Sequence, residues 1–271
     1  MKTIRHIYNN LINELSYVDN PKNETEIIIS EYCKIPKQEI YLCFDNIINA
    51  PEENQIYSAV HRRQNNEPLQ YIIGYTEFFD CKISVNGSVL IPRPETEYLV
   101  EMITKARFNS LLDVGTGSGC IAISVKKKRH EILVDAIDIS EKAIQTARSN
   151  AEQNKTKVSF FVSDVFKNVK KNYDVIVSNP PYIPLNEYEE LSPEIINFEP
   201  KNALIAEEDG MYFYKNILNE AKEYLTENGV IYFEIGYNLA ERIKEAAIQN
   251  GFDKIEVFKD LNGFDRIMRI H

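Results

Sequence analysis

The 271-residue sequence predicts an α/β protein in which a small helical bundle and a β-hairpin precede a mainly parallel sheet. Apolar residues near the N-terminus recur every three or four positions, which is typical of amphipathic helices. A strand-like alternation of apolar and polar residues begins near Gln70. From Leu111 onward, apolar runs alternate with helical segments, as in a doubly wound sheet. These observations divide the chain into a helical bundle at 1–70, a hairpin linker at 71–94 and an α/β domain at 95–271.

The N-terminal third is expected to be helical. Apolar residues from Ile4 to Leu15 form one face at helical spacing. Asn23–Glu26 offers capping residues for a second helix. Pro36 and Pro51 suit the first turns of two further helices, expected at about 37–44 and 52–64.

The hairpin is expected from two segments that alternate in a strand-like way, Tyr71–Asp80 and Cys81–Val85, with Asn86-Gly87 supplying a turn. Ile91–Pro94 contains two prolines in three residues and cannot form regular structure. A helix with acidic residues in its first turn is expected to follow, from Glu95 to about residue 107.

The α/β domain is expected to contain five strands in alternation with helices. Strands are expected at 110–114, 132–138, 157–162, 173–178 and 229–235. Helices are expected at 119–129, 140–153, 211–226 and 237–249. Two segments that flank Asn262-Gly263, at 255–259 and 266–270, predict a closing antiparallel pair.

Bulk properties argue against several classes of function. The net charge of −10 opposes a broad electrostatic contact with nucleic acid, which requires clustered lysine and arginine. The dense basic run Lys126–Arg129 is expected to be a solvated helix C-terminus. No run approaches the roughly 18 apolar residues of a membrane span, and the N-terminus lacks a signal-peptide pattern. We therefore expect a cytoplasmic protein that does not bind membranes.

The cysteines and histidines do not form a pattern typical of a metal site. The sequence contains no C-x-x-C spacing, so the cysteines are expected to be buried free thiols in a reducing compartment. They are Cys33, Cys43, Cys81 and Cys120. The histidines stand in polar contexts and are expected at the surface; they are His6, His61, His130 and His271.

The most informative motif is Asn179-Pro180-Pro181-Tyr182, which follows the predicted strand at 173–178. Open α/β sheets bind their ligands where strands end in this way. The Asn179 amide offers an acceptor and two N–H donors. Pro180 and Pro181 have fixed φ and no N–H, so their carbonyl groups stay free to accept hydrogen bonds. Tyr182 supplies a flat apolar face. The motif therefore predicts a rigid binding site for a planar group that bears an amino group.

A glycine-rich loop follows the first strand of the predicted sheet. It consists of Gly115, Thr116, Gly117, Ser118 and Gly119. Glycines permit positive φ and let a ligand approach the backbone, and the following helix N-terminus adds N–H donors. The G-x-G-x-G spacing differs from the dinucleotide fingerprint, and glycine also marks ordinary strand-to-helix turns.

Two acidic residues end the next two strands. Asp138 lies about 20 residues beyond the glycine loop, where a carboxylate can bind the ribose hydroxyls of an adenosine-containing cofactor. The alternative is that Asp138 caps the helix that begins at Ser140; the glycine loop favours the ribose interpretation. The third strand ends in Ser163–Phe166, where a polar or aromatic residue can border the adenine ring.

Taken together, these motifs resemble class I S-adenosylmethionine-dependent methyltransferases, specifically those that methylate amino or amide nitrogens. Further segments resemble the release factor glutamine methyltransferase family, PrmC/HemK, over essentially the whole chain. The most specific of them is Ile91-Pro92-Arg93-Pro94-Glu95-Thr96-Glu97. The others are Glu67–Gly74, Glu199–Leu204, Asp209-Gly210, Phe233–Gly236 and Asp260–Arg266.

The resemblance implies a Rossmann-like class I methyltransferase sheet at 95–271 that methylates the glutamine of the Gly-Gly-Gln motif in peptide chain release factors. The products would be N5-methylglutamine and S-adenosyl-L-homocysteine. It implies cofactor contacts from Gly115–Gly119, Asp138, Val165 and Asn179, and contacts to the glutamine from Asn179–Tyr182. Asn179, Pro180 and Tyr182 would be the catalytic residues, with no metal. The family often has an aromatic residue where this chain has Val165, with Phe166 next.

The partner is expected to be the release factor, recognised by residues 1–70, with no direct nucleic acid contact and with the enzyme a monomer. An alternative function is adenine-N6 methylation of DNA or RNA, because the adenine amino group suits the same motif. Such enzymes must bind phosphates and present an unstacked base, and the acidic composition opposes this. A non-catalytic cofactor-binding adaptor is a third possibility, which the complete acceptor motif disfavours.

Overall fold

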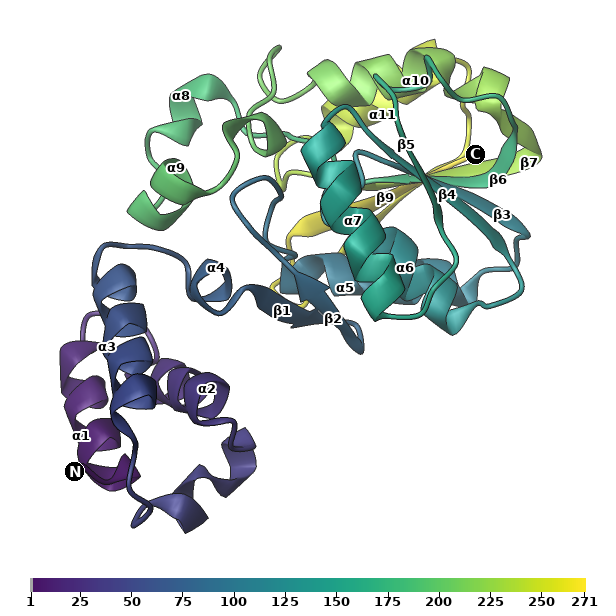
Figure 1. Cartoon of the computed structure of the whole chain (residues 1–271). Coiled ribbons are helices and arrows are strands. Elements are labelled where there is room, and N and C mark those ends of the chain that lie inside the picture. The colour runs from purple at the N-terminus through teal and green to yellow at the C-terminus, as the bar shows by residue number, and fades with distance from the viewer. Residues whose placement is uncertain (1) are drawn as a thin grey trace. The chain divides into compact units, whose positions relative to one another are not determined.

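The structure, a computed structural model, describes residues 2–271 and divides them into two compact units (Figure 1). The first unit runs from the N-terminus to Gly74 and includes the distant segment Pro193–Phe198. The second unit comprises Tyr75–Ser192 and Glu199–His271.

The first unit is helical. Its elements are α1 (Ile4–Glu14), α2 (Pro21–Cys33), the 3₁₀ helix η1 (Lys37–Cys43), α3 (Ala50–Gln64), α4 (Leu69–Ile73) and α9 (Pro193–Phe198). The predicted helices are therefore confirmed, although the segment near 37–44 is a 3₁₀ helix. The predicted cap of the second helix was wrong. The side chain of Asn20 accepts a hydrogen bond from Asn23 N and caps α2, because Pro21 already occupies the first helical turn.

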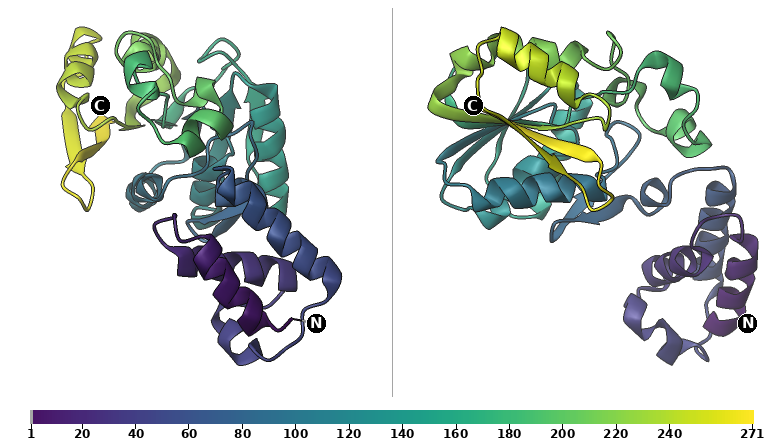
Figure 2. Two further views of the ribbon diagram at one scale, coloured as in Figure 1. Left: turned by 90° about the vertical axis from the view of Figure 1, so that its left-hand side faces the viewer. Right: turned by 180° about the vertical axis from the view of Figure 1, so that it is seen from behind.

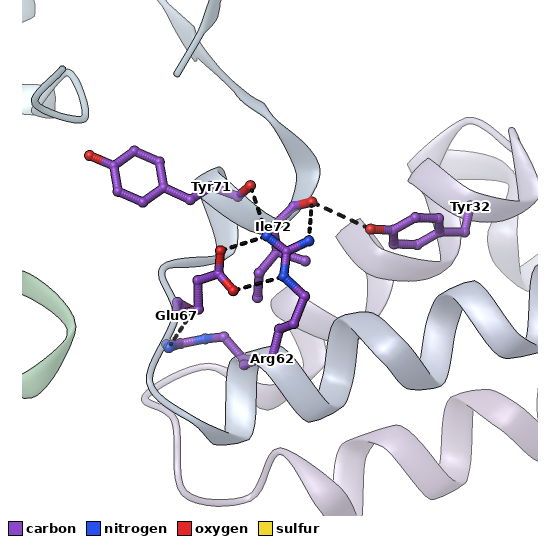
Figure 3. A network of polar contacts seen from close by, with 6 residues as sticks. Tyr32, Arg62, Glu67, Tyr71 and Ile72 are labelled. Carbon is purple, nitrogen blue, oxygen red and sulfur yellow. Dashed lines mark hydrogen bonds and ion pairs between the residues drawn. The ribbon is translucent and has the colours of Figure 1, made fainter. Parts of the chain in front are cut away.

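A polar network joins α2, α3 and α4 at the end of the first unit (Figure 3). The Arg62 guanidinium donates to both carboxylate oxygens of Glu67, at 2.7 Å from Nε and 2.5 Å from Nη2. The same group donates to the backbone carbonyls of Tyr71 and Ile72, and the Tyr32 hydroxyl also donates to the Ile72 carbonyl. The Arg62 guanidinium thus forms an ion pair with the Glu67 carboxylate and also satisfies two backbone carbonyls of α4.

The predicted hairpin exists, but its bounds and its turn differ from the prediction. Tyr71–Ile73 belongs to α4, and the hairpin comprises β1 (Tyr75–Phe78) and β2 (Cys81–Ser84). Gly74, at φ +86°, ends α4 and separates helix from strand. The turn lies at Phe79-Asp80, whose φ angles of +44° and +62° match the twist of a hairpin, rather than at Asn86-Gly87.

A seven-stranded sheet forms the centre of the second unit. Its strands are β3 (Ser110–Val114), β4 (Leu133–Asp138), β5 (Ser159–Val162), β6 (Tyr173–Ser178), β7 (Leu225–Glu234), β8 (Ile255–Lys259) and β9 (Asp265–Ile270). They lie in the order β5-β4-β3-β6-β7-β9-β8. The first five are parallel, and β9 pairs antiparallel with β7 and with β8. The predicted strands and closing antiparallel pair are confirmed, with ends shifted by a few residues.

Helices cover both faces of this sheet (Figures 1 and 2). One face carries α5 (Pro94–Lys105), α6 (Cys120–Lys128) and α7 (Glu141–Gln153); the other carries α10 (Tyr212–Tyr224) and α11 (Ala240–Gln249). Two short helices, α8 (Leu185–Tyr188) and the 3₁₀ helix η2 (Lys201–Ala203), lie in the long connection after β6. The inner strands are buried on both faces, so their sequences are nearly continuous apolar runs.

The cysteines and the basic run follow the sequence prediction only in part. All four cysteines are free thiols, but only Cys81 and Cys120 are buried, whereas Cys33 and Cys43 are half-buried. The basic run does end a helix, since Lys126–Lys128 form the last turn of α6. Within residues 2–271, no helix is long and apolar enough to cross a membrane.

Candidate active site

A cavity opens at the carboxyl ends of the parallel strands in the second unit. The loops after β3, β4, β5 and β6 line it, together with residues of the segment Ser88–Thr96. The strand order reverses between β3 and β6, which lie side by side while the chain leaves them in opposite directions across the sheet. Ligands of open α/β sheets bind at this kind of topological switch point.

The glycine-rich loop forms the floor of the cavity, except at its last residue. Gly115 and Gly117 have φ angles of +74° and +54°, and a Cβ atom at either position would meet only open space. These backbone positions can therefore be approached closely by a ligand. Thr116 and Ser118 also line the cavity. Gly119 does not line it; a Cβ there would lie 3.0 Å from Ala147 Cβ, so this glycine lets α6 pack against α7.

A buried carboxyl group holds the loop from below. Thr116 Oγ1 donates to Asp113 Oδ2 at 2.6 Å, and Asp113 is completely buried. Burial raises the pKa of Asp113 to about 7. Its other oxygen has no hydrogen-bond partner among residues 2–271. The hydrogen bond between Thr116 and Asp113 fixes the side chain of Thr116 within the loop.

Asp138 lines the cavity beside the loop, and its carboxylate joins two elements. Gly117 N donates to Oδ2 at 2.9 Å, and Ser140 N donates to Oδ1 at 2.8 Å. Burial raises the pKa of Asp138, although these backbone donors oppose the shift. The cap of α7 is the Ser140 side chain, which accepts from Ala143 N. Asp138 is therefore not the N-cap, and it remains a candidate for binding ribose hydroxyls.

The loop after β5 settles which of two neighbouring side chains borders the cavity. Ser163, Asp164 and Val165 line it, whereas Phe166 is completely buried and stacks on Tyr224 at a centroid distance of 4.5 Å. Val165 adopts a φ of +44°, which is unusual for a β-branched residue. The Ser163 hydroxyl donates to the Val165 carbonyl at 2.7 Å and stabilises this conformation.

The acceptor motif lies where the sequence predicts, at the carboxyl end of β6. Asn179, Pro180 and Pro181 line the cavity, but Tyr182 does not. Tyr182 packs against the apolar core, and burial raises its pKa to about 12. A Cβ atom on Gly210 would lie 2.4 Å from the Tyr182 carbonyl oxygen, so the backbones of these two residues touch. The Tyr182 side chain therefore lies on the core side of the motif.

Two functional candidates were missed at the sequence level, Thr96 on α5 and Glu234 at the end of β7. Asn179 Nδ2 donates to Thr96 Oγ1 at 3.3 Å, and Thr96 Oγ1 donates to Glu234 Oε2 at 2.7 Å. Both residues are 2% exposed, and Thr96 lines the cavity. Each lies in a segment that carries the family resemblance, Ile91–Glu97 or Phe233–Gly236, and this was the only available signal.

Another of these segments is brought to the same site by a buried carboxylate. Glu199 accepts from Arg93 Nη2 at 2.6 Å and from Ile91 N at 3.3 Å. Arg93 lines the cavity, and so does Asn202, three residues after Glu199. The segments Ile91–Glu97 and Glu199–Leu204 therefore form one wall, although about 100 residues separate them.

The cavity fits an adenosine-containing cofactor such as S-adenosylmethionine. The open space above Gly115 and Gly117 admits a ligand against the backbone, and Asp138 supplies acceptors for hydroxyl groups. Val165 and the 64%-exposed Ile139 add apolar surface suited to a flat ring. Within residues 2–271, no group of histidine, cysteine or acidic side chains could hold a metal ion.

Comparisons with known proteins agree with this arrangement. Residues 9–74 match the model of the PrmC N-terminal domain, and residues 94–202 match that of the methyltransferase small domain. The chain is 42% identical over 253 residues to the release factor glutamine methyltransferase of Thermodesulfovibrio yellowstonii, covering 90% of each protein. It is 40% identical over 259 residues to the enzyme of that name from Fusobacterium nucleatum, covering 93% of this chain and 73% of the relative.

Solved structures support the fold of the second unit. A methyltransferase from Pyrococcus furiosus superimposes with a TM-score of 0.55 at 20% identity, covering 82% of this chain and 98% of that protein. At this identity the likeness supports the fold alone. The sequence identities over nearly the full length are more specific, and by them this chain belongs to the release factor glutamine methyltransferase family.

Proposed function

We propose that this enzyme methylates the side-chain amide of the glutamine in the Gly-Gly-Gln motif of peptide chain release factors, giving N5-methylglutamine. Family membership supports the substrate. The observation that carries the chemistry is the orientation of the Asn179 side chain. Asn179 lines the cavity, and its side-chain nitrogen donates a hydrogen bond to Thr96. The side-chain oxygen is thus left to accept a hydrogen bond from a guest.

The residues proposed to hold the cofactor are Gly115–Ser118, Asp138, Val165 and Asn179, which line one continuous cavity. When bound, S-adenosylmethionine supplies an electrophilic methyl group on a sulfonium ion. The glycine loop would contact it through backbone N–H groups, and Asp138 would accept hydrogen bonds from ribose hydroxyls.

The acceptor motif would make an unreactive nitrogen available. An amide nitrogen is a poor nucleophile because its lone pair is delocalised into the carbonyl group. The Asn179 side-chain oxygen and the Pro180 carbonyl would accept hydrogen bonds from its two N–H groups, which localises the lone pair and orients it. Neither proline has an N–H that could compete for these acceptors. Catalysis would then depend mainly on orientation.

Transfer of labelled methyl groups from S-adenosylmethionine to a purified release factor tests this function. We expect label on the Gly-Gly-Gln glutamine, located by peptide mass spectrometry, and none when that glutamine is replaced. Absence of label with a folded enzyme that binds S-adenosyl-L-homocysteine would contradict the proposal. Adenine-N6 methylation is not favoured, and mass spectrometry of cellular adenines with and without the gene discriminates it.

The enzyme is proposed to act as a monomer in the cytoplasm without contacting nucleic acid directly. The helical unit is proposed to recognise the body of the release factor. Leu42 and Ile47 are 85% and 61% exposed on this unit, although both are large apolar residues. If they contact the release factor, Leu42→Ser with Ile47→Ser raises the KM for the intact protein and leaves the affinity for S-adenosyl-L-homocysteine unchanged. An unchanged KM would argue against recognition through this surface.

A further inference from the structure

The amide of Asn179 lies at the end of a buried chain of hydrogen bonds. Its Nδ2 atom donates to Thr96 Oγ1 at 3.3 Å, and the Thr96 hydroxyl donates to Glu234 Oε2 at 2.7 Å. Thr96 and Glu234 are each only 2% exposed. Bulk water therefore cannot easily replace either partner, and the chain couples the end of β7 to the acceptor motif after β6 through the first turn of α5.

The direction of this chain follows from the charge of Glu234. An ionised carboxylate only accepts hydrogen bonds, so the Thr96 hydroxyl must use its single proton toward Glu234. The Thr96 oxygen can then act only as an acceptor toward Asn179. Only the nitrogen end of the Asn179 amide can satisfy it, and the Asn179 oxygen must point elsewhere.

We infer that Thr96 and Glu234 are positioning residues for methyl transfer: ionised Glu234 sets the direction of the hydrogen bonds, and Asn179 receives that direction through Thr96 and through its own side-chain hydrogen bond to the Glu234 carboxylate. The Asn179 oxygen is thereby held ready to accept an N–H of the acceptor amide. The identity of that amide rests on the proposed function, but the orientation of Asn179 does not.

The charge of Glu234 is sensitive to pH near neutrality. Burial raises its pKa to about 7, although Thr96, Arg266 and Asn179 favour the charged form. The titratable and charged groups that face it come from every neighbouring element: Glu95 on α5, Cys120 on α6, Tyr182 after β6, Tyr214 on α10 and Arg266 on β9.

Protonation reverses the chain. A protonated Glu234 can donate to Thr96, and the Thr96 hydroxyl can then donate to Asn179. The amide of Asn179 is then free to turn its oxygen toward Thr96 and its N–H groups toward the cavity. These N–H groups cannot accept a hydrogen bond from the substrate. Turnover should therefore decrease as the pH falls through about 7.

The first test compares variants in methylation of a release factor across this pH range. Glu234→Gln keeps the shape but carries both donors and acceptors, so it cannot impose one direction. We expect its kcat at about pH 8 to fall roughly ten-fold or more, with little change in KM or in the affinity for S-adenosyl-L-homocysteine. The decrease of kcat toward acid pH should disappear. Thr96→Val should lower kcat similarly, whereas Thr96→Ser should restore it.

Tyr214→Phe is the matched control. The Tyr214 hydroxyl donates to the backbone carbonyl of Glu234 at 2.9 Å, so its loss disturbs the same residue without touching the carboxylate. Its kcat and pH profile should match the wild type. A Glu234→Gln enzyme with wild-type kcat and pH profile would overturn the inference, and so would equal activities of Thr96→Val and Thr96→Ser.

A second measurement does not depend on the substrate. The side-chain amide resonances of ¹⁵N-labelled Asn179, assigned with Asn179→Asp, should shift with a midpoint near pH 7 in the wild type and stay constant in Glu234→Gln. Failure of the wild type to methylate release factors would refute the proposed function alone. Resonances that do not respond to pH would refute this inference, whatever the enzyme methylates.

Discussion

Two polar networks in this protein place a glutamate carboxylate in different surroundings. In the helical unit, Arg62 and Glu67 form a bidentate ion pair whose side chains are 41% and 19% exposed (Figure 3). In the sheet unit, Glu234 is almost completely buried and accepts a hydrogen bond from the neutral hydroxyl of Thr96. The first network pairs each charge, whereas the second buries a charge beside neutral donors.

The difference indicates what each network is for. The guanidinium of Arg62 also satisfies carbonyl groups of α4, so its network secures the end of the helical unit. Burial of the Glu234 carboxylate destabilises the folded state by more than the nearby Arg266 offsets, and the raised pKa of Glu234 reflects this. A protein keeps such a group where it serves an adjacent site, and here the adjacent residue is Asn179.

Asn179→Ala should have the largest effect, because it removes the group that the sheet-unit network orients. We expect kcat to fall by roughly 10²–10³-fold, as when a preorganised hydrogen-bonding group is lost, while S-adenosyl-L-homocysteine still binds. Steady-state kinetics and calorimetric titration measure the two quantities. Asn172→Ala is a suitable control, since Asn172 precedes the other end of β6 and donates to backbone carbonyls there. Near-normal turnover of Asn179→Ala would show that the network around Glu234 does not serve catalysis.

Gly210→Ala should disturb the acceptor motif from behind. The new methyl group would approach the Tyr182 carbonyl oxygen to 2.4 Å, which forces one backbone to move. A displacement near 1 Å at a reacting group can lower turnover by as much as about 10²-fold, and we expect a loss of roughly ten-fold or more. Gly263→Ala is the control, because Gly263 has a similar φ of +84° with nothing within 4 Å. Equal activities would show that the position of Tyr182 does not matter.

The sequence predicted well those features that depend on local pattern. Each parallel strand was evident as an apolar run, and the groups that follow the strands, such as Gly115, Asp138 and Asn179, line one cavity because parallel strands end at one edge. The partners of Asn179 were not predictable in this way. Thr96 and Glu234 lie 83 and 55 positions away along the chain, and only the folded sheet brings them together.

Other failures have local causes. Tyr71–Ile73 alternates like a strand but is helical, because Pro68 begins α4 and Gly74 ends it after five residues. The hairpin turn carries Phe79 and Asp80 in a left-handed conformation without glycine, so the usual turn signal is absent. Tyr182 was expected to contact the substrate, and this role stays a prediction. Its side chain packs against the apolar core and does not line the cavity, which the sequence did not indicate.

Glu234→Gln should be more stable than the wild type above neutral pH, even though it should be less active. The pKa of Glu234 is raised in the folded state to about 7 from an ordinary value near 4.5. The folded protein therefore holds this proton more tightly, and wild-type stability declines as the pH rises from about 4.5 to about 7. We expect the variant to gain roughly 1–3 kcal/mol at about pH 8 and almost nothing at about pH 4.

Urea unfolding at these two pH values measures the difference. Asp113 also has a raised pKa, but it is present in both proteins and its contribution cancels. A Glu234→Gln protein that is less stable than the wild type at about pH 8 would mean that the buried carboxylate stabilises the fold. Both the Glu234 network and the Arg62–Glu67 ion pair would then stabilise the fold, and they would no longer differ in this respect.

Glu67→Gln should have the smallest effect and complete the comparison. Arg62 is more than a third exposed, so water and salt screen its attraction to Glu67, and the Arg62 guanidinium keeps its contacts with the carbonyls of Tyr71 and Ile72. We expect a loss of less than about 1 kcal/mol in unfolding free energy, shrinking further at high salt. The kcat and the affinity for S-adenosyl-L-homocysteine should not change, because the pair contributes only to its own unit. If instead kcat fell without a loss of stability, the Arg62–Glu67 network would act on catalysis as the Glu234 network does, and the two could no longer be separated into structural and functional roles.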